Sequence, residues 1–241
     1  MQTRPARLPA LDLARTGALA AMASYHFGYD LEAFGYLAPG TMLSGWPAIY
    51  ARCIASGFLI MVGIGLYLGH GAGVRWRPFC RRLAMVLAGA ALVSLATWYT
   101  EDRYFVFFGI LHSIAVSSLV GLLFLRLPAG LTLLVALAAF LAPDYLRSAL
   151  FDTPWLMWLG LTTGPVLSVD YIPTLPWLAP VLTGVAGAKL AHRAGLWARL
   201  ADVGQGLQWL AWPGRHSLLV YLAHQPLLIG LVWSFGWLTG H

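Results

Sequence analysis

Residues 105–125 read FVFFGILHSIAVSSLVGLLFL and contain no aspartate, glutamate, lysine or arginine. An uncharged apolar stretch of this length is typical of a helix that crosses a lipid bilayer, because the hydrocarbon core takes about 20 helical residues. The stretch ends at Arg126, Leu127 and Pro128, a charge followed by a helix breaker. We therefore expect a transmembrane helix over residues 105–125.

The composition of the whole chain extends this expectation. Of its 241 residues, 59% are hydrophobic and only 10% are charged, whereas a soluble domain carries about 25% charged residues. A chain of this length allows about seven spans of roughly 20 residues with their connections. Because no polar low-complexity linker divides it, we expect one transmembrane domain over residues 1–241.

The apolar stretches predict seven spans. They lie at about residues 11–29, 48–68, 83–99, 105–125, 131–142, 174–191 and 216–238. The fifth is short for a span. The long connection 143–172 contains prolines and tryptophans that suggest an interfacial or re-entrant segment, and residues 200–212 are compatible with a short interfacial helix.

The charges are distributed as in a protein whose N-terminus lies in the cytoplasm, where connections are enriched in lysine and arginine. In that orientation the inner side holds twelve of the fifteen basic residues: Arg4, Arg7, Arg15, Arg75, Arg77, Arg81, Arg82, Arg126, Lys189, Arg193, Arg199 and Arg215. The outer side holds seven of the nine acidic residues: Asp30, Glu32, Glu101, Asp102, Asp144, Asp152 and Asp170. The sequence thus predicts an all-α, polytopic transmembrane helix bundle of the bacterial inner-membrane type, with the N-terminus inside and the C-terminus outside.

Several classes of function are disfavoured. The net charge of +6 is explained by cytoplasmic connections, so we expect no nucleic-acid partner. Cys53 and Cys80 lack metal-ligand spacing and fall at opposite membrane faces, so we expect neither a metal nor a disulfide. The chain has no Walker-type glycine loop and no Gly-x-Ser-x-Gly elbow. The glycines of the second span predict close helix packing; they are Gly57, Gly63, Gly65 and Gly69.

The first span carries four ionisable residues, which are expensive in a membrane and are functional candidates for that reason. Asp12 and Arg15 lie three positions apart near its inner end, and His26 and Asp30 lie four apart near its outer end, so each pair shares a helix face. An aspartate beside a histidine raises the basicity of the ring, as a general base needs. The alternatives are an ion pair at the headgroups and an interfacial hydrogen bond.

Two more spans carry polar candidates on the outer side. His112 and Ser113 lie near the outer end of the fourth span, and at the depth of His26 they would complete an acid–base centre; alternatively, His112 only bonds a neighbouring helix. Asp170 opens the motif Asp170-Tyr171-Ile172-Pro173 before the sixth span. Its alternative role is that of a solvated loop aspartate.

The seventh span begins at residues 213–217, Pro-Gly-Arg-His-Ser. Arg215 would lie at the inner face, where it could meet a phosphate or simply anchor the helix. His224 and Gln225 lie deeper and precede Pro226. Polar residues at such a proline suit the lining of a cavity, but also contacts between helices.

Taken together, the motifs resemble one family. The blocks are residues 11–17 (LDLARTG) with Met22 and 25–31 (YHFGYDL), 108–113 (FGILHS), 170–173 (DYIP) with Pro176-Trp177, and 214–218 (GRHSL) with 221–226 (YLAHQP). In this order, over nearly the whole chain, they resemble bacterial membrane proteins similar to the heparan-alpha-glucosaminide N-acetyltransferase catalytic region.

The resemblance implies a membrane acyltransferase that moves an acyl group, typically acetyl, from cytoplasmic acyl-coenzyme A to a sugar-type acceptor on the outer side. It is compatible with a homo-oligomer, and the lack of metal-ligand spacing in the sequence leads us to expect no metal. We expect the following site residues: His26 as general base or nucleophile, Asp30 to orient it, and His112 to share the proton or hold the thioester carbonyl; Arg15 and Arg215 for the coenzyme A phosphates, Asp12 at the inner mouth, His224 and Gln225 along the channel; Asp170 and Ser113 for the acceptor.

The chain departs from the eukaryotic pattern at one point. There the key histidine follows the first catalytic span in a loop, but residues 31–47 contain no histidine here. This favours a different acceptor, or direct transfer without an acyl-histidine. Two other classes stay open: a small proton-coupled transporter, although no half-chain repeat is evident, and a structural subunit in which the polar pairs only hold helices together.

Overall fold

The computed structural model describes residues 8–101, 105–201 and 203–239. Arg4, Arg7 and Asp102, which entered the charge comparison, lie outside these ranges. Within them the chain is helical and has no strand; an isolated parallel bridge joins Phe108 and Tyr171. The predicted all-α class is therefore confirmed for the part of the chain that the structure describes.

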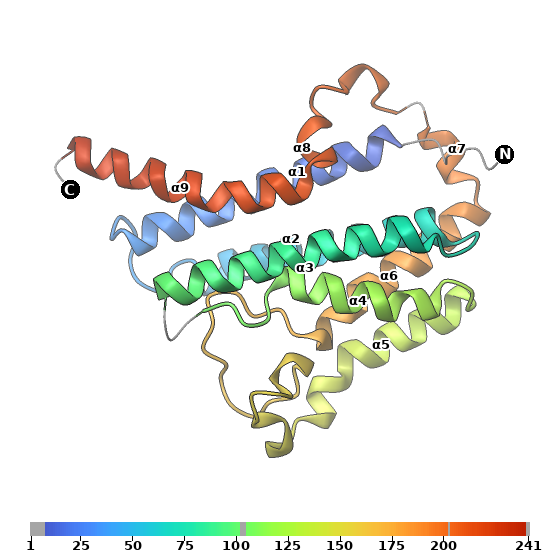
Figure 1. The fold of residues 1–241 in the computed structure, drawn as a ribbon, viewed down its shortest axis with the longest axis horizontal. Coiled ribbons are helices and arrows are strands. Elements are labelled where there is room, and N and C mark those ends of the chain that lie inside the picture. Colours follow the sequence, from blue (N-terminus) through green and yellow to red (C-terminus); the bar gives the residue numbers. More distant parts are fainter. Residues whose placement is uncertain (1–7, 102–104, 202, 240–241) are drawn as a thin grey trace. The chain divides into compact units, whose positions relative to one another are not determined.

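Seven long helices in the described ranges correspond to the seven expected spans (Figure 1). They are α1 (Pro9–Ala33), α2 (Gly45–His70), α3 (Trp76–Glu101), α4 (Ile110–Phe124), α5 (Ala129–Leu146), α6 (Thr174–Arg193) and α9 (Ser217–Thr239). By length and composition, α2, α3, α5 and α9 could each cross a membrane, and α4 is a shorter apolar helix. The number of crossings and their orientation stay predictions.

Two expectations about individual segments were wrong, one about the length of the fifth span and one about residues 200–212. The fifth apolar helix is not short, because it continues through the buried Pro143 to Leu146. Residues 200–212 do not form one helix. Gly204 has a φ of +84°, which interrupts any helix there, and the segment is divided among α7 (Leu196–Leu200), a 3₁₀ turn and α8 (Trp212–Arg215).

The connection between α5 and α6 is folded by its own hydrogen bonds. It contains two 3₁₀ turns, Ala149–Asp152 and Met157–Leu159. The Asp152 carboxylate accepts both the N–H and the hydroxyl of Thr163, at 2.8 and 2.6 Å, and the Tyr171 hydroxyl donates to the Met157 carbonyl at 2.6 Å. These bonds fix the chain that leads to Asp170.

The described residues form two compact units, and α2 contributes to both. Unit 1 comprises Leu59–Ala198, and unit 2 comprises the described residues of 8–58 and 199–239. Apolar side chains of α2, α4, α5 and α6, such as Leu59, Ala136 and Leu182, form the core of unit 1.

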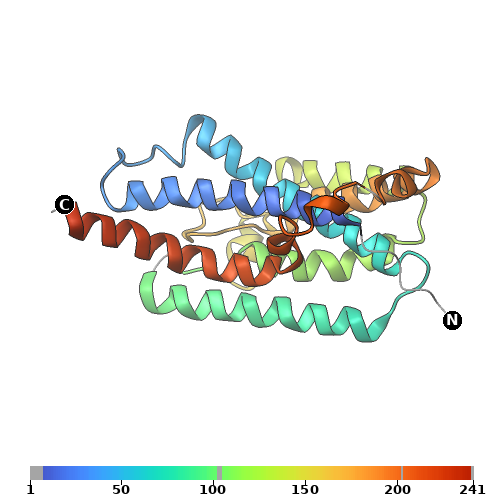
Figure 2. The same cartoon turned by 90° about the horizontal axis from the view of Figure 1, so that it is seen from above.

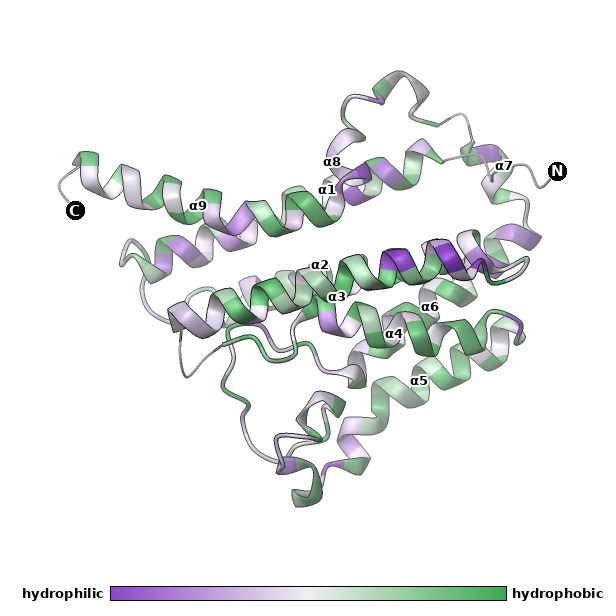
Figure 3. Ribbon diagram, in the orientation of Figure 1, coloured by the Kyte–Doolittle hydropathy of each residue, from purple (hydrophilic) through white to green (hydrophobic). Residues whose placement is uncertain are grey.

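Figure 3 shows hydrophilic residues gathered near the N-terminal end of α3, where Arg77, Arg81 and Arg82 lie.

In unit 1, α2 and α6 approach each other closely enough to bring backbone against backbone. A Cβ atom at Gly63 would lie 2.0 Å from the Val181 carbonyl oxygen, and one at Gly184 would lie 2.1 Å from the Ile60 carbonyl oxygen. Only glycine fits at such contacts, as in close pairs of membrane helices. The predicted close packing is confirmed at Gly63, but not at Gly57 or Gly69, where a Cβ would have no neighbour within 4 Å.

Lys189 of α6 is buried at 6% exposure, although its charge suggests a solvated position at the inner face. Its ammonium group donates to the carbonyl oxygens of Phe124 and Leu127 at 2.6 and 2.7 Å and lies 3.2 Å from the Thr132 hydroxyl. The side chain thus binds two carbonyl oxygens at and just beyond the end of α4, one of which, that of Phe124, also accepts the Leu127 N–H at 3.2 Å.

We expect Lys189→Met to destabilise the protein by about 2–5 kcal/mol, because it removes the hydrogen bonds of a buried ammonium group to two carbonyl oxygens and a hydroxyl while keeping most of the apolar stem. Thermal unfolding of the detergent-solubilised protein measures this change. Arg193→Met is the matched control, since that side chain is exposed on the same helix. Equal stability of the two variants would contradict the bridging role.

In unit 2, α1 and α9 lie side by side and run in the same direction (Figure 2). Near the start of α1, the Asp12 carbonyl touches Gly214 in α8. Farther along, the ring of His26 meets that of His224, and past the end of α1 the ring of Tyr36 lies 6.2 Å from that of Phe235. The two ends of the sequence therefore build one parallel helix pair.

Candidate functional site

The central part of the α1–α9 pair brings together His26 and His224. Their ring centroids are 4.9 Å apart, with the ring planes at 65°, so the edge of one ring faces the other. Helical spacing had marked His26 as a candidate base and His224 as a channel lining. The structure of unit 2 instead places both imidazoles in one cluster.

Beside the histidines, Asp30 is paired with Gln225. The Gln225 Nε2 group donates to Asp30 Oδ1 at 2.6 Å, and Asp30 is only 3% exposed. Within the described residues, no hydrogen bond joins Asp30 to His26. The orientation of His26 by Asp30 therefore stays a prediction, because α9 supplies an amide donor to one oxygen of the carboxylate.

Three polar atoms in this cluster are buried and lack a hydrogen-bond partner in the described part of the chain. They are Asp30 Oδ2, His224 Nε2 and Gln225 Oε1. Buried polar groups in proteins are rarely left unpaired, so each such atom needs an explanation. Three in one cluster, in a strongly apolar chain, make this cluster a candidate functional site.

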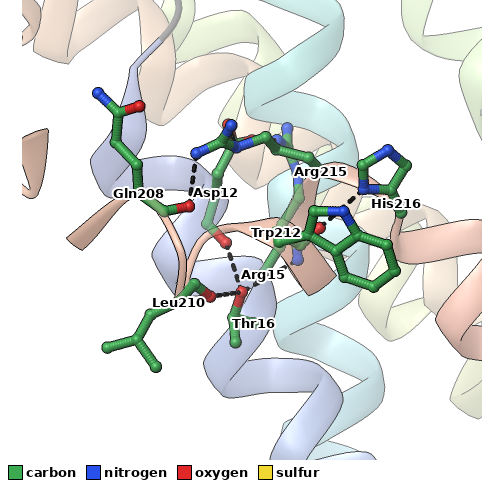
Figure 4. A network of polar contacts seen from close by, with 9 residues as sticks. Asp12, Arg15, Thr16, Gln208, Leu210, Trp212, Arg215 and His216 are labelled. Atoms are coloured by element: carbon green, nitrogen blue, oxygen red, sulfur yellow. Dashed lines mark hydrogen bonds and ion pairs between the residues drawn. The ribbon is translucent and has the colours of Figure 1, made fainter.

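A second polar cluster lies where α1 meets α8 (Figure 4). Asp12, 4% exposed, receives the Arg15 guanidinium at 2.8 Å, and Arg215 Nε lies 4.0 Å from the other carboxylate oxygen. Arg215 also donates to the Gln208 carbonyl at 2.6 Å. The expected Asp12–Arg15 pair is confirmed. The Asp12 carboxylate thus has two partly exposed guanidinium groups beside it, those of Arg15 and Arg215.

The backbone around this cluster is tightly fitted. A Cβ atom at Gly214 would lie 1.9 Å from the Asp12 carbonyl oxygen, so only glycine fits there. The Thr16 hydroxyl accepts the Gly214 N–H at 3.0 Å and lies 2.8 Å from the Leu210 carbonyl oxygen. Asp12 and His26 are fourteen helical positions apart, about 21 Å at the usual rise, so the two clusters are well separated along α1.

Unit 1 holds the remaining candidates, His112, Ser113 and Asp170. His112 Nδ1 accepts the Gly109 N–H at 3.2 Å, and its Nε2 lies 3.5 Å from the Ser94 hydroxyl. Asp170 Oδ2 accepts the Ile110 N–H at 2.9 Å, which satisfies a donor at the start of α4. The Ser113 hydroxyl is fully buried and has no partner in the described ranges.

His112 and Asp170 thus meet at the start of α4. The alternative role of His112, a hydrogen bond to a neighbouring helix, is what the structure of unit 1 displays. His26 and Asp30 belong to unit 2, so a single centre formed by His26 and His112 stays a prediction. Within the described ranges, no group of three or more histidine, cysteine, aspartate or glutamate residues is arranged to hold a metal ion.

The pKa of Asp170 predicts a pH dependence of stability. Burial raises this pKa from its ordinary value of 3.8 to about 6, against the opposing effect of the Ile110 hydrogen bond. Because the pKa is higher in the folded protein, the group's stabilising contribution is complete below the unfolded pKa and is lost as pH rises through about 6. The unfolding temperature should therefore fall between about pH 4 and pH 7.

The matching variant is Asp170→Asn, which keeps the size of the side chain and removes its titration. We expect its unfolding temperature to change much less over this pH range. In the wild type, the pH-dependent change in the free energy of unfolding should be on the order of 1–3 kcal/mol. A pH dependence identical to that of the wild type would assign the effect to another group.

Sequence analysis missed the two contacts that define the cluster of unit 2, His26 with His224 and Asp30 with Gln225. The signal that could have found them is the run His224-Gln225-Pro226, which places two polar side chains beside a helix proline in an apolar segment.

Comparisons with known proteins give one family. The model described as "Heparan-alpha-glucosaminide N-acetyltransferase, catalytic" matches residues 7–226, which cover both polar clusters of α1 and most of the polar residues of α9. No curated protein and no solved structure matches the chain.

Proposed function

Since the chain belongs to the heparan-alpha-glucosaminide N-acetyltransferase catalytic family, we propose that it is a membrane-embedded acyltransferase. It moves an acyl group, typically acetyl, from cytoplasmic acyl-coenzyme A to a sugar-type acceptor on the outer side of a bacterial inner membrane. The observation that carries this proposal is the buried cluster of His26, Asp30, His224 and Gln225, with its three unpartnered polar atoms.

The chemistry of the cluster suits acyl transfer. An attacking amine or hydroxyl must lose a proton as it bonds to the thioester carbon, and an imidazole is the side chain best matched to that task near neutral pH. Two imidazoles lie in contact here, and a carboxylate–amide pair lies beside them. His112, Ser113 and Asp170 of unit 1 are further candidates for holding the acceptor or the thioester.

The cluster of Asp12, Arg15 and Arg215 suits the phosphate-bearing end of acyl-coenzyme A. Guanidinium groups bind phosphate with paired hydrogen bonds, and here a buried carboxylate holds two of them at one position. We propose that they bind phosphate groups of coenzyme A. The positive-inside rule puts this end of α1 in the cytoplasm, where acyl-coenzyme A is found.

The course of the helices supports the proposed topology. Because α1 and α9 run in the same direction, they would start on the same side of the membrane, so an even number of crossings fits between their starting points and the total including α9 is odd, as seven spans require. The proposal keeps the N-terminus inside and the C-terminus outside. A homo-oligomer is compatible with it.

Binding of acetyl-coenzyme A to the purified, detergent-solubilised protein tests the donor. We expect saturable binding by the wild type. Arg215→Ala should weaken it about tenfold or more, because a charge-assisted hydrogen bond contributes about 1.5–3 kcal/mol. His26→Ala should bind as the wild type does, since it lies about 21 Å along α1 from Asp12.

Two controls make the result interpretable. Arg193→Ala removes an exposed guanidinium of unit 1 and should leave binding unchanged. Thermal unfolding of each variant shows whether it is folded. A folded wild type that does not bind acetyl-coenzyme A would refute the proposal, and accumulation of a solute by vesicles without coenzyme A would then favour the proton-coupled carrier.

A further inference from the structure

The hydrogen bond of His224 to its own helix fixes which ring nitrogen carries the hydrogen. His224 Nδ1 lies against the carbonyl oxygen of Tyr221. A carbonyl oxygen only accepts, so Nδ1 must donate. In the neutral imidazole, the other nitrogen then has a free lone pair. That atom, His224 Nε2, is buried and lacks a hydrogen-bond partner within the described residues.

The neighbouring unpartnered atoms have the same character. Gln225 uses its amide nitrogen to donate to Asp30 Oδ1, and this orients its own Oε1 as an acceptor. Asp30 Oδ2 is likewise an acceptor when the carboxyl group is ionised. In addition, Pro226 has no N–H to offer the Leu222 carbonyl one turn earlier. The three unpartnered atoms of the cluster are therefore all acceptors, and the N–H of the His26 ring is a donor beside them.

A site of this kind selects between the two reactants. The carbonyl oxygen of a thioester is itself an acceptor and would find no partner among these atoms. An amine or hydroxyl brings N–H or O–H hydrogens, which would satisfy several of them. The acceptor-rich cluster is therefore suited to the group that becomes acylated rather than to the thioester carbonyl.

We propose that His224, and not His26, receives the proton of the attacking group, while Asp30 Oδ2 and Gln225 Oε1 hold and orient that group. This assignment rests on the proposed acyltransferase function. It differs from the expectation drawn from helical spacing, which gave the proton to His26. His26 then lies beside the base, with its ring in contact with that of His224.

The step is balanced as follows. The nitrogen or oxygen of the acceptor bonds to the carbonyl carbon of the thioester, and its proton passes to His224 Nε2. The carbon–sulfur bond breaks, and its electron pair leaves with the sulfur of coenzyme A. His224 then returns the proton to the thiolate, directly or through water. The products are the acylated acceptor and free coenzyme A thiol, and the imidazole is neutral again.

Release of thiol from acetyl-coenzyme A, with glucosamine as the acceptor probe, measures this step over a range of pH. We expect His224→Ala to lower kcat about a hundredfold or more, as is typical for loss of a general base, and to retain the KM for acetyl-coenzyme A. Added imidazole should restore part of the rate. The pH profile of kcat/KM should lose its lower ionisation in this variant and keep it in His26→Ala.

A second, size-conserving variant tests the proposal even if His224→Ala does not fold. Asp30→Asn keeps the size of the side chain but can turn a donor toward the site, so we expect a raised KM for glucosamine and an unchanged KM for acetyl-coenzyme A. His192→Ala, which removes an exposed ring of unit 1, is the control and should behave as the wild type.

The outcomes separate the two levels of the argument. A folded wild type that releases no thiol refutes the proposed function, and this assignment with it. An active wild type whose rate and pH profile persist in His224→Ala overturns the assignment alone. The same holds if imidazole rescues His26→Ala but not His224→Ala, because the base would then be His26.

Discussion

His26→Ala is expected to lower the rate of acyl transfer by about a hundredfold or more without weakening the binding of acetyl-coenzyme A. The ring lies in edge contact with that of His224, 4.9 Å between centroids, beside three buried atoms that have no partner in the described ranges. Removing it leaves a gap next to the proposed base and lets the second imidazole move. A displacement of about 1 Å at a reacting centre can by itself cost a hundredfold.

Transfer of radiolabelled acetyl groups to glucosamine by the protein in lipid vesicles is the measurement, with His192→Ala as the matched control. Thermal unfolding should show that both variants keep the fold. Full transfer activity in His26→Ala would show that His26 takes no part in the reaction, and full activity in both His26→Ala and His224→Ala would exclude the α1–α9 cluster as the chemical centre. His112 and Asp170 of unit 1 would then be the remaining candidates for the chemical centre.

Gly184→Ala is expected to reduce the free energy of unfolding by about 3 kcal/mol or more. The added Cβ would lie 2.1 Å from the Ile60 carbonyl oxygen, a backbone atom that cannot turn aside. Gly63→Ala meets the same obstacle from the other helix, 2.0 Å from the Val181 carbonyl oxygen. Either change must push α2 and α6 apart and uncouple the core packed around Leu182.

Gly187→Ala provides a control on the same helix, because a Cβ there has no neighbour within 4 Å. Alanine is the better helix former by about 1 kcal/mol, so this variant should be as stable as the wild type or slightly more stable. Unfolding temperatures in detergent compare the three. Equal stability of Gly184→Ala and Gly187→Ala would show that α2 and α6 are not in backbone contact.

The helices were predictable from sequence because their signal is strong and local. An apolar run of about 20 residues gives the same answer whatever its neighbours are, and each expected span coincides with a helix of the described chain. The errors lie where that signal is weak. Pro143 looked like the end of a helix but lies inside α5, and the apolar residues of 200–212 are interrupted at Gly204.

The polar clusters were predictable only in part. Helical spacing correctly paired Asp12 with Arg15, since both lie on α1. It could not pair Asp30 with Gln225 or His26 with His224, because those contacts depend on which face of α9 packs against α1. Lys189 shows the same limit, since its charge suggested solvent while its carbonyl partners lie on other elements.

The pairing of α1 with α9 also means that α1 is synthesised well before its partner helix. α1 ends at residue 33 and α9 begins at residue 217, so the ribosome needs roughly 10–40 s to add the residues between them. Throughout that interval, the Asp30 carboxylate of the nascent chain lacks the Gln225 amide that pairs with it later. The cluster can be completed only after α9 has been synthesised, so a chain released before that point would retain an Asp30 carboxylate without its amide partner.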